Sequence, residues 1–316
     1  MRALILGNDG RLTLGHAPLP AWPGECLIRV TLAGICGTDL HMLEGYAEFT
    51  GVPGHEFVGV VEDAPAADAQ WIGRRVVGEI NVGCGTCERC GSGLKEHCAH
   101  RTVVGIRERA GTFAEFLSLP ARNLHHVPDH VDDRAAVFAE PVAAACRIVE
   151  QVVVKADTRT VVIGDGRLGN LIAQVLATRT SDLVLIGRHE PKLSVARELG
   201  IDARTIDGAV PGDYDLVVDA TGRPDGLERA LELVRPRGTV VLKSTCHGAT
   251  TMSLWPVPVH EIKIVGSRCG PFSMAVDYLA DGAVKTAPLV AAIFPLESYQ
   301  EAFATARHEL KVLLQP

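Results

Sequence analysis

The pattern of apolar and polar positions changes character near residue 147. Before that point, residues 27–32 alternate between apolar and polar side chains, and residues 57–62 and 75–80 are also strand-like. Glycine and proline interrupt these runs at short intervals, as they do in barrel-like β domains. The sequence therefore predicts a β-rich domain over residues 1–147.

Beyond residue 147, short apolar runs typical of buried strands alternate with segments of helical spacing. The predicted strands cover residues 160–163, 183–186, 216–219, 239–242 and 262–265, and the predicted helices cover residues 168–177, 191–199 and 225–234. Strands and helices that alternate over short links form a doubly wound parallel sheet. We therefore expect an α/β protein with a Rossmann dinucleotide-binding domain over residues 148–283.

The last segment of the chain is expected to rejoin the first domain. Residues 282–288 are typical of a linker, residues 298–306 have helical spacing, and residues 311–314 form a strand-like run. On this interpretation, residues 284–316 complete the β-rich domain.

Composition narrows the class of protein. The chain has 316 residues, of which 47% are hydrophobic and 22% charged, and its net charge is -7. These values are typical of a globular protein with two domains and argue against nucleic acid as a partner. No apolar run approaches the roughly 18 residues of a membrane span. We also expect no signal peptide, because the chain opens on a strand-like run.

Four of the nine cysteines form a cluster in a glycine-rich stretch, with the spacing C-x2-C-x2-C-x7-C. They are Cys84, Cys87, Cys90 and Cys98. Close cysteine pairs on tight turns give zinc its tetrahedral set of thiolates, so a structural zinc is favoured over empty thiols or disulfides. The odd cysteine count and the clustering favour a reducing, cytoplasmic compartment.

A second set of metal-binding residue types lies nearer the start of the chain. Cys36 and His55, together with a carboxylate from Glu56 or Glu140, would give zinc three protein ligands and one open position. Each residue alone has an ordinary explanation: a single buried cysteine usually packs in a core, and Glu140 beside Pro141 is also typical of a helix start.

Residues just after Cys36 strengthen the zinc interpretation. Thr38 and His41 follow it by two and five positions, where a hydroxyl and an imidazole can pass a proton to solvent. Asp39 is suited to hold the second ring nitrogen of a ligating histidine.

A glycine-rich motif follows the first predicted strand of the second domain. Gly164, Gly166 and Gly169 have the G-x-G-x-x-G spacing and open the helix predicted over residues 168–177. In this context the glycines permit a tight turn and close approach of a pyrophosphate to the helix N-terminus. Arg167, Leu168 and, after a later strand, Thr221 are assigned to the same cofactor site.

The end of the next strand bears on the choice of cofactor. NAD-binding domains usually place Asp or Glu there to hold the ribose hydroxyls, whereas this chain has Gly187 and Arg188. Gly187 would leave room for a 2′-phosphate and Arg188 would bind it, assisted by His189 or Lys192. NADP is therefore favoured, and an NAD site that lacks its acid is the alternative.

These motifs together resemble the zinc-dependent medium-chain alcohol dehydrogenase family over essentially the whole chain. Residues 36–41 (Cys-Gly-Thr-Asp-Leu-His) and 138–141 (Phe-Ala-Glu-Pro) are most similar to the threonine and sorbitol, or polyol, branch. The resemblance implies a GroES-like catalytic domain made from both ends of the chain, a Rossmann domain between them, a cleft for zinc and nicotinamide, and a homodimer or homotetramer.

The resemblance also implies roles for individual residues. Cys36, His55 and Glu56 would be the zinc ligands, Glu140 would exchange with them or bind through water, and Thr38 and His41 would form the proton relay. Two departures matter: Gly187 and Arg188 break the usual NAD pattern, and the segment from Cys36 to His55 is short for the branch.

We therefore predict a dehydrogenase with two zincs that interconverts a secondary alcohol and a ketone with NADP, and a polyol or sugar-like substrate is among the candidates. The alternatives are an NAD-dependent polyol or threonine dehydrogenase, a zinc-free reductase of the same fold, and a non-catalytic NADPH-binding protein. Four aromatic residues, Tyr46, Phe49, Trp255 and Phe272, are candidates for the substrate pocket.

Overall fold

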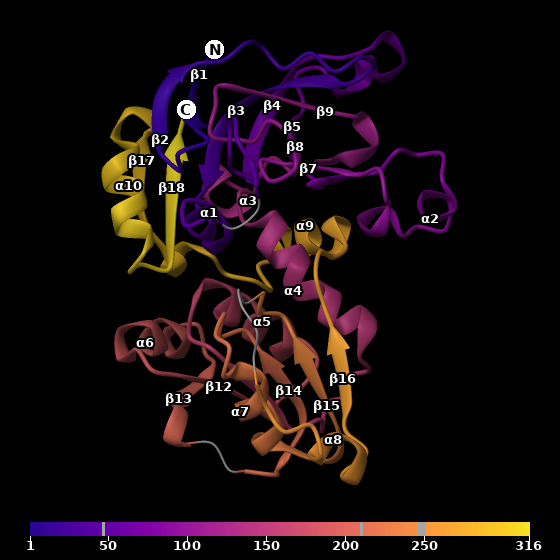
Figure 1. Cartoon of the computed structure of the whole chain (residues 1–316), viewed down its shortest axis with the longest axis vertical. Helices are drawn as coiled ribbons and strands as arrows, with labels where there is room; N and C mark the ends of the chain where they lie inside the picture. Colours follow the sequence, from indigo (N-terminus) through magenta and orange to yellow (C-terminus); the bar gives the residue numbers. More distant parts are fainter. Residues whose placement is uncertain (46–47, 209–210, 246–250) are drawn as a thin grey trace. The chain divides into compact units, whose positions relative to one another are not determined.

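The computed structural model describes residues 1–45, 48–208, 211–245 and 251–316, so the candidate pocket residue Tyr46 lies outside the described residues. The chain divides into two compact units, Met1–Glu140 with Val290–Pro316, and Pro141–Leu289 (Figure 1). The first boundary of this division follows Glu140, and both Glu140 and the predicted boundary at residue 147 lie inside helix α4 (Ala139–Gln151).

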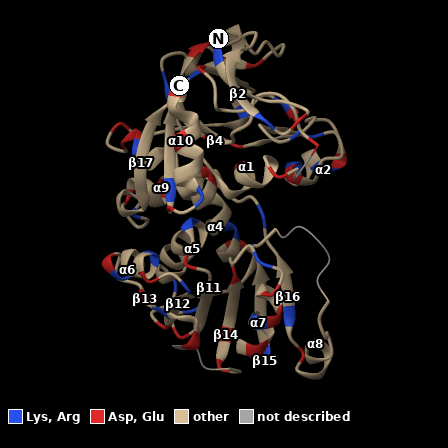
Figure 2. Cartoon of the chain, turned by 60° about the vertical axis from the view of Figure 1, so that its left-hand side comes forward, with Lys and Arg blue, Asp and Glu red and all other residues tan. Residues whose placement is uncertain are grey.

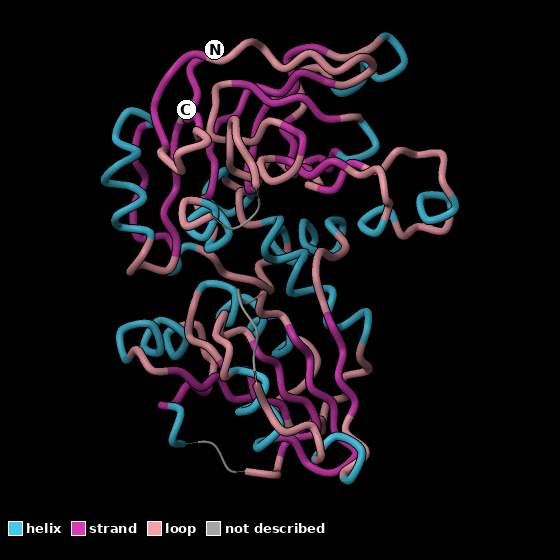
Figure 3. The backbone as a smooth tube through the Cα atoms, in the orientation of Figure 1, coloured by secondary structure: helices cyan, strands magenta, loops and turns pink. Residues whose placement is uncertain are grey.

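The first unit is built mainly from strands and loops, as Figure 3 shows. Its strands are β1 (Arg2–Leu6), β2 (Leu12–His16), β3 (Cys26–Gly34), β4 (Glu56–Asp63), β5 (Arg75–Gly78), β6 (Asn81–Val82), β7 (Thr102–Val104), β8 (Glu108–Arg109), β9 (Phe116–Leu119), β10 (Leu124–His126), β17 (Val290–Pro295) and β18 (Lys311–Gln315). Its helices are α1 (Gly37–Met42), α2 (Glu88–Gly91), α3 (Asp133–Ala136) and α10 (Tyr299–Ala306), with short 3-10 turns η1 (Ala66–Trp71), η2 (Lys95–His97), η3 (Ala121–Asn123) and η6 (Leu296–Ser298).

The largest sheet of this unit joins the two ends of the chain. Its order is β10-β5-β4-β3-β18-β17, and β9 also pairs with β3. The C-terminal strand β18 runs antiparallel to β3 through the pairs Leu313 with Gly34 and Leu314 with Ala33. These contacts place Lys311, at the start of β18, in the same sheet as the residues just before Cys36.

The second unit is a single parallel sheet with intervening helices. Its elements are β11 (Thr160–Ile163), α5 (Arg167–Ala177), β12 (Leu183–Gly187), α6 (Glu190–Glu198), β13 (Asp202–Thr205), η4 (Ile206–Gly208), β14 (Tyr214–Asp219), α7 (Gly226–Leu233), β15 (Val234–Leu242), α8 (Pro256–Val259), β16 (Lys263–Gly266), α9 (Phe272–Ala280) and η5 (Ala287–Leu289). The sheet order is β13-β12-β11-β14-β15-β16. This order is the doubly wound arrangement of dinucleotide-binding domains, whose ligands bind beyond the carboxyl ends of the strands.

Apolar strand residues hold this sheet against its helices. Val161, Ile186, Val217 and Val240 are buried in one cluster with residues of α7, such as Ala230. Burial on both faces explains why these strands are continuous apolar runs in the sequence, since a parallel sheet is covered on both sides.

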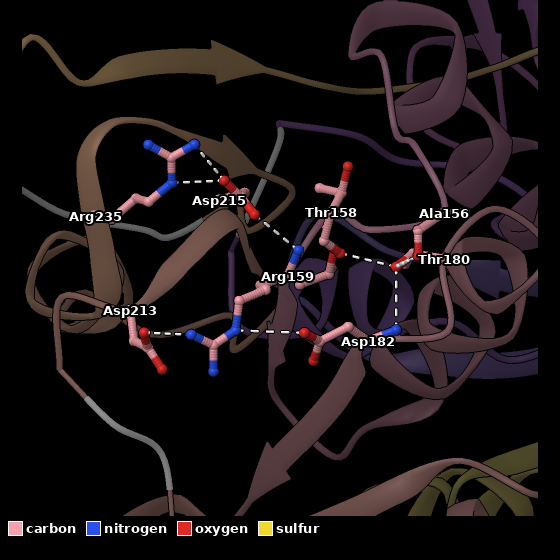
Figure 4. Close-up of polar contacts among 9 residues, drawn as sticks. Ala156, Thr158, Arg159, Thr180, Asp182, Asp213, Asp215 and Arg235 are labelled. Carbon is pink, nitrogen blue, oxygen red and sulfur yellow. Dashed lines mark hydrogen bonds and ion pairs between the residues drawn. The ribbon is translucent and has the colours of Figure 1, made fainter.

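A polar network ties together the opposite, amino-terminal edge of the same sheet (Figure 4). The Arg159 backbone N–H donates to Asp215 Oδ2 at 2.8 Å, and its guanidinium pairs with Asp213 and with Asp182. Thr180 Oγ1 donates to the Thr158 carbonyl at 2.8 Å. These contacts join the starts of β11, β12 and β14, which leaves the carboxyl edge for ligand binding.

Strand β13 and helix α9 of the second unit are among the elements that the sequence pattern did not predict. Strand β13 reads Asp-Ala-Arg-Thr, and its charged residues fit its place at the edge of the sheet, where charge discourages pairing with another chain. Helix α9 was missed as well; it precedes the predicted linker and is buried through Phe272 and Leu279.

Charged side chains of both signs are interspersed over each unit, as Figure 2 shows. No helix in the described part of the chain is long and apolar enough to cross a membrane.

Candidate active site

Three potential metal ligands meet where β3 ends and β4 begins. Cys36 follows β3 and precedes α1, His55 immediately precedes β4, and Glu56 is the first residue of β4. Gly34 pairs with Glu56 across the two strands, and a Cβ at Gly34 would lie 2.2 Å from Glu56 Oε2. Only glycine therefore leaves room for this carboxylate. One donor atom from each of Cys36, His55 and Glu56 lies within 4.8 Å of the others.

Asp39 fixes two of these three residues. Its Oδ2 accepts a hydrogen bond from the Cys36 backbone N–H at 2.8 Å, which caps helix α1. Its Oδ1 lies 3.2 Å from His55 Nδ1, and both side chains are almost fully buried. The expected contact between Asp39 and a histidine is thus present, and it leaves His55 Nε2 as the atom that can face a metal.

The same geometry favours a positive charge between Cys36 and Asp39. Burial alone would lower the pKa of His55, but the charges of Asp39 and Cys36 outweigh it and raise that pKa well above its usual range. A cation in this place would be stabilised by the same two groups.

Glu56 has one oxygen paired and one without a partner. Its Oε2 forms an ion pair with Lys311 Nζ, and both side chains have 0% exposure. Its Oε1 is buried and finds no hydrogen-bond partner among the described residues. A buried carboxylate oxygen with no partner is costly, and a metal ion would satisfy it.

The donor set therefore fits zinc. A thiolate, an imidazole nitrogen and a carboxylate oxygen are the ligand types that zinc takes, and three of them leave the open position of a catalytic site.

Lys311 was not predicted as a site residue. It stands in the apolar run Lys-Val-Leu-Leu that the sequence predicts as a strand. A lysine inside a buried strand needs a carboxylate partner, so a buried ion pair could have been predicted at this position. The sequence alone does not identify the carboxylate.

The other predicted residues of this site lie around it. Thr38 Oγ1 is 3.8 Å from Cys36 Sγ, and His41, on the same helix, is 54% exposed at its side chain and lies 3.5 Å from Glu44. Glu140 is half-buried in the first turn of α4 and does not belong to the group of Cys36, His55 and Glu56. Its role as a ligand stays a prediction.

The candidate pocket aromatics differ in their surroundings. Phe272 is a buried core residue, with 4% exposure, whereas Trp255 is 59% exposed. Phe49 is half-buried and lines a groove of the first unit, as Trp22 does.

The four clustered cysteines lie in the loop that carries α2 and η2. Cys84 Sγ is 4.0 Å from Cys90 Sγ, and Cys87 Sγ is 3.7 Å from Cys98 Sγ. All four sulfur atoms lie within 4.8 Å of one another, which fits a closed tetrahedral zinc site.

Two thiols of this loop have pKa values shifted in opposite directions. The Thr86 backbone N–H, and then its hydroxyl, lower the pKa of Cys84 to about 5. A backbone N–H from Gly85 acts in the same direction on Cys90, but burial and the other cysteines raise its pKa to about 11. Zinc would remove this conflict because it holds four thiolates together.

Replacing Cys87 by Ala is expected to remove one zinc per chain and to lower the melting temperature by at least about 5 °C, because metal binding supplies folding energy to such loops. Metal analysis and a thermal scan check both effects. Cys146→Ala, a buried cysteine of α4 outside both metal groups, is the matched control. If Cys87→Ala keeps the same zinc content as the wild type, the assignment of a structural zinc site is contradicted.

The glycine motif forms the turn between β11 and α5. Gly164 has φ +117°, and a Cβ there would lie 2.6 Å from the Ala220 carbonyl oxygen. A Cβ at Gly169 would lie 1.8 Å from the Gly164 carbonyl oxygen, whereas a Cβ at Gly166 would meet nothing within 4 Å. Gly166 is the N-cap of α5 and provides no side-chain cap, so the first N–H groups of the helix are open to a phosphate. The turn fits a dinucleotide.

The two glycines give a matched pair of variants. Gly169→Ala is expected to destabilise the protein by about 1–3 kcal/mol, because the new methyl group overlaps backbone. Gly166→Ala is expected to keep the stability but to weaken NADPH binding at least about tenfold, because its methyl group stands where a pyrophosphate must approach. Thermal scans and NADPH titration separate the two; equal stability loss in both would contradict this assignment.

The end of β12 differs from what the sequence indicated. Arg188 is exposed, lying 3.5 Å from Asp225, and Lys192 is half-buried on α6. Gly187 itself brings no carboxylate to this strand end, but Asp165 reaches it from the glycine motif and accepts a hydrogen bond from the Arg188 backbone N–H at 2.7 Å. This contact could not be predicted, since Asp165 stands at a variable position of the motif.

A pocket of the second unit opens at this edge of the sheet. Thr221 lines it, with its N–H and hydroxyl donating to Asp219 Oδ1 at 2.9 and 2.7 Å. Asp165, Gly187 and Arg188 line the same pocket.

Comparison with known proteins places this geometry among dehydrogenases. The family model described as alcohol dehydrogenase GroES-like domain matches residues 22–129, and that described as zinc-binding dehydrogenase matches residues 168–281. Erythritol/L-threitol dehydrogenase of Mycolicibacterium smegmatis is 30% identical, with 100% of this chain and 98% of the relative covered.

Two solved structures share the fold at 26% identity, each covering 100% of this chain and 99% of its own. One is an alcohol dehydrogenase (rspB) of Escherichia coli CFT073 complexed with NADH, with a TM-score of 0.92. The other is a zinc-binding dehydrogenase of Sinorhizobium meliloti 1021 bound to NADP, with a TM-score of 0.91.

Proposed function

Because this chain belongs to the zinc-dependent medium-chain alcohol dehydrogenase family, we propose that it transfers a hydride between a secondary alcohol and NADP, with a ketone as the oxidised product. The chain combines a GroES-like domain with a Rossmann domain and is an NAD(P)-dependent dehydrogenase. The observation that carries the proposal is the meeting of Cys36, His55 and Glu56 donor atoms within 4.8 Å.

Each residue of the site has a role in this proposal. Cys36, His55 and Glu56 would hold a zinc ion, and Asp39, which lies beside His55 Nδ1, leaves Nε2 of that ring as the atom that would bind it. When bound, zinc supplies a Lewis acid for the alcohol oxygen, and the nicotinamide accepts the hydride.

Proton transfer is assigned to residues of helix α1. The Thr38 hydroxyl, beside the Cys36 sulfur, would accept the alcohol proton while it releases its own proton toward His41, and the exposed His41 would pass that proton to water. Glu140 is proposed as a carboxylate that exchanges with a ligand or binds through water, as the family resemblance implies.

Support for NADP comes from Arg188. Its side chain is 50% exposed at the end of β12, where a guanidinium can bind a phosphate through its planar fork.

A polyol or sugar-like alcohol is the proposed substrate class, because an M. smegmatis relative is named erythritol/L-threitol dehydrogenase.

A homodimer or homotetramer is also part of the proposal. Leu254, Trp255 and Val259 are more than half exposed around α8, and Ile264 is 38% exposed on the edge strand β16. A second copy would cover such an apolar surface.

The proposal keeps a reducing, cytoplasmic compartment, since zinc binds thiolates and not disulfides.

The test combines metal analysis with a substrate screen. The purified protein is expected to hold two zincs per chain and to reduce NADP with at least one member of a panel of secondary alcohols and polyols. Its matched sample is the same protein after removal of zinc by a chelator, which is expected to lose turnover. A protein without zinc that reduces quinones or enones would be the zinc-free reductase instead. NADPH binding without turnover across the panel in both directions would favour a non-catalytic binding protein.

A further inference from the structure

The carboxylate of Asp165 lies where a residue at the end of β12 would place its own side chain. A Cβ built on Gly187 would lie 2.3 Å from Asp165 Oδ2 and 2.4 Å from its Cγ. In an aspartate at position 187, the carboxylate carbon would be one bond, about 1.5 Å, from that Cβ. The two carboxylates would therefore occupy nearly the same space, although one comes from the turn after β11 and the other from the end of β12.

Donors on the β12–α6 turn hold this carboxylate in one position. Asp165 Oδ2 accepts from the backbone N–H groups of Arg188 at 2.7 Å and His189 at 2.6 Å. His189 Nδ1 lies 3.0 Å from Oδ1. The Asp165 side chain is 9% exposed and lines the pocket at the carboxyl edge of the sheet. A buried, hydrogen-bonded carboxylate is a fixed negative charge for any ligand in that pocket.

The carboxyl edge of β12 is where a dinucleotide-binding domain reads the adenosine ribose. An acid there accepts hydrogen bonds from the ribose hydroxyls of NAD and repels the 2′-phosphate of NADP. The Gly187 and Arg188 pattern indicates that this acid is missing, yet Asp165 supplies one from the glycine-rich turn that follows the neighbouring strand β11.

We propose that Asp165 is the residue that reads the ribose 2′ position, and that it opposes the preference of Arg188 for a 2′-phosphate. The inference rests on the proposed dinucleotide site. The two charges act in opposite directions, so the protein binds both NADP and NAD, with a small ratio between their affinities. Arg188 is also partly neutralised, because it lies 3.5 Å from Asp225, which itself pairs with Arg223.

A structural role for Asp165 predicts something different. If the side chain only ties the turn together, any group that accepts the Arg188 and His189 N–H bonds will serve. Asparagine keeps the size and the accepting oxygen of Asp165 but removes the charge. Asp165→Asn therefore separates the charge from the hydrogen bonds.

The experiment measures dissociation constants of NADH and NADPH by fluorescence titration of the zinc-loaded protein, without substrate. In Asp165→Asn, NADPH is expected to bind about tenfold more tightly relative to NADH, because a fixed negative charge near the phosphate is gone. In Arg188→Ala, the ratio is expected to move about tenfold in the opposite direction. An unchanged ratio in Asp165→Asn, with both cofactors affected alike, overturns the proposal.

A second variant tests the proposal even if asparagine at position 165 disrupts the turn. In the double variant Asp165→Gly with Gly187→Asp, the acid returns to the end of β12 and the overlap at Gly187 is removed. NADH is expected to be preferred over NADPH in this protein as in a conventional NAD site, and a preference for NADPH would count against the inference. The ratio of affinities does not depend on turnover, so a failed substrate screen would reject the proposed activity without deciding the role of Asp165.

Discussion

Replacing Cys36 by Ser is expected to reduce turnover by at least about 1,000-fold and to remove one of two zincs per chain. Loss of a metal that polarises the reacting oxygen costs several kcal/mol of transition-state stabilisation, and each 1.36 kcal/mol is a factor of ten. Cys36 contributes the only sulfur in its group, because its partners His55 and Glu56 offer nitrogen and oxygen. Serine binds zinc poorly at neutral pH, since its hydroxyl stays protonated.

The matched control for this variant is Cys26→Ser. Cys26 opens the same strand, β3, is fully buried, and lies outside both metal groups of the described residues. Burial, which is the largest cause, raises the pKa of the Cys26 thiol to about 11. This shift disfavours the thiolate form that binds zinc. Cys26→Ser is expected to keep both zincs and the wild-type turnover number. The assignment of Cys36 fails if its serine variant retains two zincs and turns over within a few-fold of wild type.

Much of the fold could be predicted because its signals are local. The strand over residues 160–163 and the helix that follows it carry apolar periodicity and glycine punctuation within a few residues, and the structure has them as β11 and α5. The four-cysteine loop is equally local, since its ligands lie within one short segment. Such features need no knowledge of which distant segments meet.

The parts that could not be predicted depend on contacts between distant residues. Asp165 acts at the end of β12 only because β11 and β12 are neighbours in the sheet, and the glycine motif itself allows any residue at that position. The residues at the end of β12, Gly187 and Arg188, therefore do not show by themselves that a carboxylate from another segment lies beside them. Edge strand β13 was missed for a related reason, since its charge is explained by its position in the sheet.

The pair formed by Lys311 and Glu56 is the clearest case, and replacing Lys311 by Met is expected to destabilise the protein by about 3–5 kcal/mol. Both side chains are fully buried, so methionine would leave the Glu56 charge without its cation. Breaking a buried pair by removing one partner typically has this cost, although replacing both partners can be neutral. Denaturant unfolding of the variant and the wild type measures it.

The size of this destabilisation is also expected to depend on bound zinc. Glu56 also belongs to the group of candidate ligands, so a bound zinc would partly replace the lost cation. The destabilisation of Lys311→Met should therefore be larger in chelator-treated protein than in the zinc-loaded protein. Lys263→Met, on the exposed edge strand β16, is the control and is expected to change stability by less than about 0.5 kcal/mol. If both lysine variants change the free energy of unfolding by the same small amount, the pair with Lys311 does not hold Glu56 in place. The position of Glu56 would then depend on Gly34 and on the pairing of β3 with β4.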